Sequence, residues 1–134
     1  MPTRQSHAPI KIFTVDDSPI LQERLHTVLQ DLKAIQIAGH ASNIASALKA
    51  IEKILPEVVI LDIHLKNDAP SANGLDLLFI LRKSYPKMII MMLTNLATPQ
   101  YMTRCMELGA DYFYDKTNDF EKIPETLKTM IKSK

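Results

Sequence analysis

The sequence predicts an α/β fold, a three-layer doubly wound sandwich in which helices cover both faces of a five-stranded parallel sheet. One observation is that short apolar runs alternate five times with longer amphipathic segments. A second is that the middle runs are apolar almost throughout, as expected for parallel strands buried on both faces. A third is the length of 134 residues, which suits a single domain of ordinary size. Right-handed crossovers between successive strands then place helices on both sides of the sheet.

The first unit is a strand over residues 10–15 followed by a helix. The strand stops at Asp16-Asp17-Ser18-Pro19, where Ser18 suits the capping position of a helix and Pro19 its first position. Apolar residues then recur at steps of mainly three and four, which predicts one buried helical stripe. The stripe consists of Ile20, Leu21, Leu25, Val28, Leu29 and Leu32.

The second and third units repeat this order. Residues 35–41 form a short apolar strand, and a helical pattern over residues 44–55 ends at Pro56. Residues 58–61 are continuously apolar and close on Asp62, which predicts a strand buried on both faces. After a polar stretch, the third helix is marked by Leu75, Leu78, Phe79 and Leu81.

The fourth unit begins with an apolar run over residues 88–93 that ends at Thr94. Thr98 and Pro99 supply the cap and the first position of a helix that reaches about residue 108. In this helix, the spacing predicts that Cys105, together with Met102 or Met106, packs in the core.

The fifth unit starts with a brief aromatic strand over residues 112–114, which precedes Lys116. A last amphipathic helix follows, and Pro124 makes its start irregular. Its apolar positions are Phe120, Ile123, Leu127, Met130 and Ile131.

Charge and composition exclude several classes of protein. Lys and Arg number 16 and Asp and Glu 15, so the net charge of +1 gives no general attraction to nucleic acid or anionic membranes. No segment approaches the roughly 18 apolar residues of a membrane span, and residues 1–9 lack the apolar stretch of a secretory signal. Cys105 is the only cysteine, which suits a reducing compartment. We therefore expect a cytoplasmic protein, with a flexible segment at residues 1–9 and one domain at residues 10–134, that contacts neither nucleic acid nor membrane directly.

Polar side chains gather where the predicted strands end. Ligands of open parallel sheets bind at the carboxyl ends of the strands. The residues at those ends are Asp16, Asp17, Asp62, Thr94 and Lys116. Carboxylates are the oxygen ligands that Mg²⁺ prefers, and a lysine can stabilise the oxygens of a transferring phosphoryl group. Asp62 follows the most apolar strand and is the candidate nucleophile, since aspartyl phosphates are known covalent intermediates.

These residues lie in the segments Val15-Asp16-Asp17-Ser18, Val59-Ile60-Leu61-Asp62, Met92-Leu93-Thr94-Asn95, and Leu108-Gly109-Ala110-Asp111-Tyr112-Phe113 followed by Asp115-Lys116. In this order, the segments resemble the receiver domain of two-component response regulators. The resemblance covers nearly the whole chain. It implies a flavodoxin-like (CheY-like) sheet with the strand order 2-1-3-4-5.

The resemblance also implies a reaction and a metal. Asp62 would accept a phosphoryl group from a phosphohistidine of a sensor histidine kinase or a histidine phosphotransfer protein. Asp17 and Asp62 would bind Mg²⁺ directly, Asp16 would act largely through water, and the backbone carbonyl of His64 would complete the protein ligands. The chain would modify itself and act on no metabolite, so we expect a phosphoacceptor and no metabolic enzyme.

The remaining implied roles concern signalling. Lys116 would pair with the phosphoryl group, Thr94 would move to hydrogen-bond it, and Phe113 would be the aromatic switch that packs inward. Leu96 occupies a position that influences the access of hydrolytic water in the family, and we expect a comparatively long-lived phosphate. Output would be contact of the fourth helix, fifth strand and fifth helix with a downstream protein target, by a monomer or a transient homodimer.

Two alternatives to a phosphorylated single-domain regulator stay open. One is a receiver-like module that binds a protein partner without phosphate. The other is a receiver excised from a longer transcription regulator. The segment between Asp62 and Gly74 is longer than is usual in the family, and its role is also open.

Overall fold

The structure is a computed structural model, which describes residues 9–65 and 73–133. Within them, strands and helices alternate along the chain, and the sheet has the order β2-β1-β3-β4-β5 with parallel pairing throughout. The predicted fold class and strand order are therefore confirmed. The elements are β1 (Ile10–Val15), α1 (Pro19–Leu29), β2 (Ile35–Ala41), α2 (Ile44–Ile54), β3 (Val58–Leu61), α3 (Gly74–Ser84), β4 (Ile89–Thr94), α4 (Pro99–Glu107), β5 (Tyr112–Asp115) and α5 (Lys122–Ser133).

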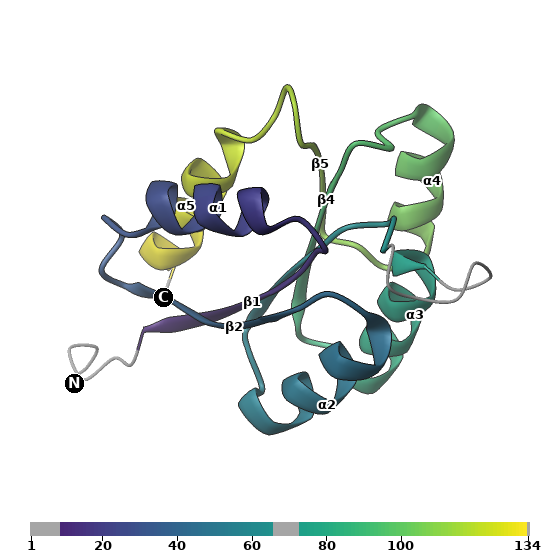
Figure 1. The fold of residues 1–134 in the computed structure, drawn as a ribbon, viewed down its shortest axis with the longest axis horizontal. Coiled ribbons are helices and arrows are strands. Elements are labelled where there is room, and N and C mark those ends of the chain that lie inside the picture. Colours follow the sequence, from purple (N-terminus) through teal and green to yellow (C-terminus); the bar gives the residue numbers. More distant parts are fainter. Residues whose placement is uncertain (1–8, 66–72, 134) are drawn as a thin grey trace.

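Helices cover both faces of the sheet. Figure 1 shows α1 and α5 on one face and α2, α3 and α4 on the other. Successive residues of β3 belong to different cores: Val58 and Ile60 pack with α1 and α5, whereas Val59 and Leu61 pack with the other three helices. Both faces of this strand are buried, because the sheet lies between two helical layers.

Polar caps start the helices that follow β1 to β4. Each cap is a Ser, Asn or Thr whose side-chain oxygen accepts a hydrogen bond from a backbone N–H of the first turn. The caps are Ser18, Asn43, Asn73 and Thr98. Pro19 and Pro99 occupy the first helical positions, as the sequence predicts. The helices therefore begin immediately after the loops at the carboxyl edge of the sheet.

Several predicted core positions are wrong. β2 is an edge strand and only half-buried, because it pairs with β1 on one side alone. Ile20, Phe79, Met102 and Met106 lie on the exposed faces of their helices, although their spacing fits the apolar stripes. The predicted burial of Cys105 is confirmed.

Two helix ends also differ from the predictions. α2 ends one residue early, because Leu55 adopts the left-handed conformation with φ 52° and its side chain is exposed. Phe120 is buried as predicted, but it lies in the turn that precedes α5 and not in the helix. Pro124 lies in the first turn of α5, where a missing N–H leaves no helical hydrogen bond unmade.

Two predictions fall on residues that the structure does not describe. The segment at residues 1–9 lies outside the described residues except for Pro9, and the long segment before α3 is described only up to Leu65 and from Asn73. None of the helices in the described ranges is long and apolar enough to cross a membrane.

Candidate functional site

The sheet itself fixes the backbone of the site. Asp16, Asp62 and Lys116 each lie at the carboxyl end of a strand, and their backbone N–H groups still donate to neighbouring strands. Each of these bonds is 3.0 Å long, from Asp16 to the carbonyl of Ala41, from Asp62 to that of Val15, and from Lys116 to that of Thr94. The three side chains therefore start from a rigid scaffold at one edge of the sheet.

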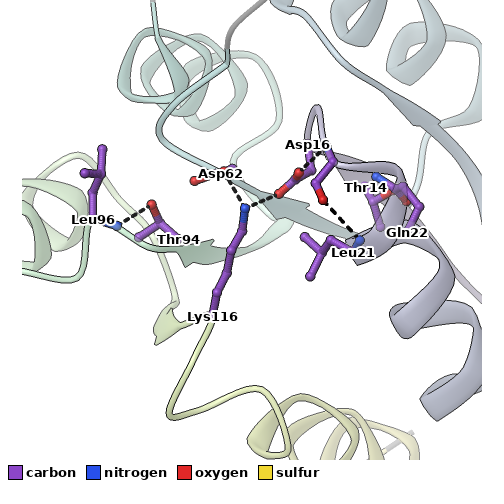
Figure 2. A network of polar contacts seen from close by, with 9 residues as sticks. Thr14, Asp16, Leu21, Gln22, Asp62, Thr94, Leu96 and Lys116 are labelled. Carbon is purple, nitrogen blue, oxygen red and sulfur yellow. Dashed lines mark hydrogen bonds and ion pairs between the residues drawn. The ribbon is translucent and has the colours of Figure 1, made fainter.

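Lys116 bridges the two aspartates. Its Nζ lies 2.8 Å from Oδ2 of Asp16 and 2.7 Å from Oδ2 of Asp62. Figure 2 shows the lysine side chain reaching from the end of β5 to a point between the two carboxylates. Both aspartates are buried, so the ion pairs are largely shielded from water.

The electrostatic balance keeps a positive charge on the lysine. Burial alone would lower the pKa of Lys116, but hydrogen bonds and attraction to Asp16 and Asp62 raise that pKa above its ordinary value. Burial raises the pKa of the Asp16 carboxyl above its ordinary value, against the opposing influence of Lys116. With both aspartates ionised, two carboxylates share one ammonium group, and a further cation would be stabilised here.

Asp16 also shapes the turn into α1. Its Oδ1 accepts a hydrogen bond of 2.7 Å from the N–H of Ser18, two residues along the chain. Ser18 in turn caps α1. The carboxylate of Asp16 thus has both of its oxygens engaged, one in the turn and one with Lys116.

Asp62 differs from Asp16 in one oxygen. Its Oδ2 pairs with Lys116, whereas its Oδ1 is buried and has no hydrogen-bond partner in the described part of the chain. A buried carboxylate oxygen without a donor is destabilising, and such an atom calls for a functional explanation. It is suited to receive a cation or to react with an electrophile.

Asp62 lines a cavity of about 540 Å³ at the carboxyl edge of the sheet. Most of the other residues that the sequence predicts for the site also line it. The lining comprises Asp17, Ser18, Ile20, Leu21, Arg24, Asp62, His64, Thr94, Asn95, Leu96, Lys116 and Thr117. Phe113 is not part of this lining; it is half-buried and packs against the core beneath α2, α3 and α4.

These residues fit a magnesium ion. The unpartnered Oδ1 of Asp62 is a ready acceptor, and Asp17 and His64 line the same cavity. Carboxylate and carbonyl oxygens are the ligands that Mg²⁺ takes. Among the described residues, no group of three or more His, Cys, Asp or Glu side chains is close enough to hold a metal unaided. A cation bound by Asp62 would share this carboxylate with Lys116, which pairs with its Oδ2.

Thr94 is held by its own loop in this conformation. The hydroxyl oxygen of Thr94, which is buried, accepts a hydrogen bond of 3.1 Å from the N–H of Leu96. Figure 2 shows this bond as a dashed line between Thr94 and Leu96. The hydroxyl keeps its own proton, which it can donate to a group bound at Asp62 in the same cavity.

Sequence reasoning missed two residues near the site. Gln22 on α1 accepts a hydrogen bond of 2.7 Å from the hydroxyl of Thr14 on β1, which joins this strand to the helix beside Asp16. Gly74 contacts the backbone immediately after Asp62. No local signal in the sequence marks Gly74, because its role depends on the close approach of α3 to the backbone of Asp62.

Comparison with known proteins identifies the family. The family model described as "Response regulator receiver domain" matches residues 12–128. A protein-glutamate methylesterase/protein-glutamine glutaminase of Carboxydothermus hydrogenoformans is 40% identical over 91% of this chain, which spans 35% of that protein. The sensory transduction protein LytT of Bacillus anthracis is 33% identical over 93% of this chain and 48% of its own length. The chain thus spans about a third to a half of these curated relatives.

Solved structures support the fold. The isolated receiver domain of RcsB from Salmonella enterica superposes with a TM-score of 0.83 at 19% identity, covering 94% of this chain and 91% of that chain. The signal receiver domain of NarL from Mycobacterium tuberculosis gives 0.78 at 22% identity, covering 96% and 100%. Together with the sequence match over residues 12–128, these findings show that the chain belongs to the response regulator receiver domain family of two-component systems.

Proposed function

We propose that this chain accepts a phosphoryl group on Asp62 from a phosphohistidine of a sensor histidine kinase or a histidine phosphotransfer protein. Aspartyl phosphorylation in phosphorelays is a general property of the family. The observation that supports Asp62 most directly is its uneven pairing. Lys116 engages Oδ2 at 2.7 Å, while the buried Oδ1 has no hydrogen-bond partner among the described residues.

In the transfer step, a carboxylate oxygen of Asp62 attacks the phosphorus of the phosphohistidine. A P–O bond forms while the P–N bond breaks, and the bonding electrons leave with the imidazole, which takes up a proton. The products are an acyl phosphate on Asp62 and a neutral histidine on the donor. Because phosphoryl transfer depends mainly on positioning and charge, the chain contributes the location of the carboxylate and of nearby positive charge.

Receiver domains generally bind Mg²⁺ at their acidic pocket. In this chain, Asp16, Asp17, Asp62 and the backbone carbonyl of His64 would hold the ion, with Asp16 acting largely through water. The ion, when bound, supplies positive charge for the phosphoryl oxygens. Lys116 supplies a second positive charge from the chain itself, and we expect it to bind a phosphoryl oxygen after transfer.

The switch proposed for this chain involves Thr94 and Phe113. The hydroxyl of Thr94 accepts from the N–H of Leu96, and we expect it to donate its own proton to a phosphoryl oxygen on Asp62, which would draw the loop of Leu96 with it. Phe113 lies one residue along β5 from Tyr112 and packs on the same core as Leu96. We expect movement of the loop that holds Leu96 to reach Phe113 through this shared core, which would couple the site to β5.

The output surface of this proposal is formed by α4, β5 and α5. Met102 and Met106 on α4 are apolar and each 46% exposed. Exposed methionines adapt well to a protein partner because their side chains are flexible and polarizable. We therefore assign the downstream target to this surface, with a monomer or a transient homodimer as the working state and no metabolic substrate.

Intact-protein mass tests the phosphoacceptor directly. Wild type and Asp62→Asn are incubated with a small phosphodonor, with and without Mg²⁺. We expect wild type to gain a single phosphate only when Mg²⁺ is present, and Asp62→Asn to gain none. No gain in wild type, under conditions that phosphorylate a control receiver, would refute the proposal and favour a module that binds its partner without phosphate.

The length of the relatives favours a second candidate. The chain spans 35% and 48% of two curated relatives, so it corresponds to one part of each of those proteins. The receiver could accordingly act within a longer regulator rather than alone. An immunoblot of the source cells, with an antibody raised against residues 10–134, tests this candidate. A band of receiver size indicates a single-domain protein, and a larger band indicates a longer regulator.

The domain boundaries and location are also proposals. We assign the receiver to residues 10–134 and its action to the cytoplasm, with residues 1–9 outside the domain. A variant without residues 1–9 should gain phosphate at the same rate as the full chain. A slower rate in the shortened, folded protein would show that residues 1–9 contribute to the site.

A further inference from the structure

Gly74 lies against the backbone of Asp62. It is the first residue of α3, and its N–H donates to the carbonyl oxygen of Ile63 at 2.6 Å. A Cβ atom at Gly74 would lie 2.0 Å from the carbonyl oxygen of Asp62 and 2.8 Å from the Cα of Ile63. Both distances are well below van der Waals contact, and backbone atoms cannot swing aside as the end of a side chain can.

The backbone conformation does not account for a glycine at this position. Among the glycines of the described chain, a positive φ occurs at Gly109 and not at Gly74. Alanine also has a higher helix propensity than glycine, so the helix would favour a side chain. The close approach of α3 to Asp62 and Ile63 is what excludes one.

The start of α3 is rigid. The side-chain oxygen of Asn73 accepts a hydrogen bond of 2.8 Å from the N–H of Leu75, and the carboxylate of Asp76 accepts one of 2.9 Å from the N–H of Asn73. This reciprocal capping box fixes the first turn of the helix. Leu65 is buried on the other side of the gap, so the segments that flank residues 66–72 are both anchored.

We propose that Gly74 is a positioning residue for phosphoryl transfer. Because it has no side chain, the capped first turn of α3 can press on the peptide that joins Asp62 to Ile63. This contact fixes the direction in which the carboxylate of Asp62 projects toward Lys116. The inference rests on the proposed function of Asp62 and adds the residue that holds the acceptor in place.

The size of the clash sets the expected effect. To relieve a contact of 2.0 Å, either α3 or the Asp62 backbone must move by roughly 1 Å. A displacement of about 1 Å at a reacting group can lower a rate by roughly a hundredfold. Binding of Mg²⁺ should weaken as well, since Asp62 and the carbonyl of His64 belong to the same short segment.

The test compares Gly74→Ala with Gly39→Ala. A Cβ at Gly39, on β2, would meet side-chain atoms of Phe13 at 3.1 Å and of Ile54 at 3.3 Å, so this control crowds the core away from the site. The readouts are the dissociation constant for Mg²⁺, measured by calorimetry, and the rate of phosphate gain at saturating Mg²⁺ and phosphodonor. We expect Gly74→Ala to worsen both by roughly ten- to a hundredfold. Gly39→Ala should leave both within about twofold of wild type, even if it lowers the melting temperature.

The outcomes separate this inference from the proposed function. A Gly74→Ala protein that binds Mg²⁺ and reacts like wild type would overturn the positioning role. If wild type itself gains no phosphate, the proposed function fails, and the affinity for Mg²⁺ then tests Gly74 alone. A loss of Mg²⁺ affinity in Gly74→Ala but not in Gly39→Ala supports the positioning role of Gly74. Equal Mg²⁺ affinities in the three proteins overturn it.

A measurement on wild type covers the case in which Gly74→Ala does not fold. Amide hydrogen exchange is followed at Gly74 and Gly39 with and without Mg²⁺. If α3 and the Asp62 peptide are one rigid unit, Mg²⁺ should slow exchange of the Gly74 N–H and leave that of Gly39 unchanged. The same response at both glycines would overturn the inference.

Discussion

Two charged clusters lie at opposite ends of the sheet and differ in how completely their members are paired. The site cluster, at the carboxyl ends of the strands, consists of Asp16, Asp62 and Lys116. The Arg82 cluster, at the amino ends of β4 and β5, consists of Arg82, Asp111 and the backbone carbonyls of Pro86, Met88 and Gly109. The comparison separates polar groups that hold the fold together from polar groups that are arranged for chemistry.

In the Arg82 cluster, every charged group is matched. The guanidinium donates to Oδ2 of Asp111 at 2.7 Å and to three carbonyl oxygens at 2.8–2.9 Å. Oδ2 of Asp111 also accepts from the N–H of Ile90 at 2.9 Å. One side chain on α3 thus ties together the turns that lead into β4 and β5. A complete network of this kind stabilises and rigidifies a fold.

The site cluster is incomplete by the same criterion. Two buried carboxylates share one ammonium group, and Oδ1 of Asp62 has no hydrogen-bond partner among the described residues. Such an arrangement is destabilising unless a ligand supplies the missing positive charge or donor. Incomplete pairing therefore distinguishes the site from the structural cluster, although both are built from the same kinds of side chain.

Replacing Lys116 by methionine should cause the largest loss of stability. It leaves Asp16 and Asp62 buried without a positive charge, so we expect the free energy of unfolding without Mg²⁺ to fall by about 3 kcal/mol. Mg²⁺ should recover much of this loss, because a cation that binds the folded state stabilises it. Chemical denaturation at low and high Mg²⁺ measures both effects.

Lys122→Met is the matched control for this substitution. Lys122 is exposed and pairs with Asp119 at 3.0 Å, so its loss should change stability by less than about 0.5 kcal/mol. A Lys116→Met protein that Mg²⁺ stabilises no more than wild type would contradict the shared use of these carboxylates.

Arg82→Leu should lower the free energy of unfolding by about 2 kcal/mol, because several carbonyl oxygens and Asp111 lose their donor together. The Mg²⁺ affinity of the folded variant should stay at the wild-type value, since the cluster lies at the far end of the sheet. Denaturation and calorimetry check the two expectations. Lys83→Leu, at the neighbouring exposed position, is the control and should have little effect. Equal stability of the Arg82 and Lys83 variants would break the comparison.

Leu96→Glu should shorten the lifetime of the phosphate on Asp62. Leu96 lines the cavity with an apolar side chain, and a carboxylate there could orient a hydrolytic water. We expect roughly tenfold faster loss of phosphate, less than the effect of a fully positioned general base. The decay of the phosphorylated mass over time gives the rate, with Leu96→Gln as the uncharged control. An unchanged rate in Leu96→Glu would remove this role from Leu96.

Cys105 should give the smallest effect. Burial raises the pKa of its thiol to about 11, from an ordinary value of 9.0. Folding therefore favours the neutral thiol, and this contribution is complete below pH 9 and is lost as the pH rises through about 11. Between pH 8 and pH 10, wild type should lose about 1 kcal/mol more stability than Cys105→Ala, as measured by urea denaturation. Parallel losses in the two proteins would refute a buried, neutral thiol.

Much of the fold could be predicted from the sequence, because apolar runs, caps and prolines are local signals. β3 and the caps Ser18 and Thr98 are examples. The exposure of Ile20 and Phe79 could not be predicted, since helical spacing shows which residues share a face but not how far the neighbouring layer extends over it.

The candidate site could be predicted only in part. The convergence of Asp16, Asp62 and Lys116 follows from the rule that strand ends meet at one edge of the sheet. The unpartnered Oδ1 of Asp62 and the contact of Gly74 with the carbonyl of Asp62 could not be predicted. Both depend on distances between individual atoms, which a sequence pattern does not give.

The most direct test measures phosphate gain and stability together in Asp62→Asn and Arg82→Leu. With Mg²⁺ and a small phosphodonor, we expect Asp62→Asn to keep its stability to within about 1 kcal/mol and to gain no phosphate. Arg82→Leu should lose stability, yet each folded chain should gain one phosphate. Phosphate gain by Asp62→Asn at the wild-type level, or no gain by folded Arg82→Leu, would contradict the assignment of phosphate acceptance to Asp62 and of a purely structural role to Arg82.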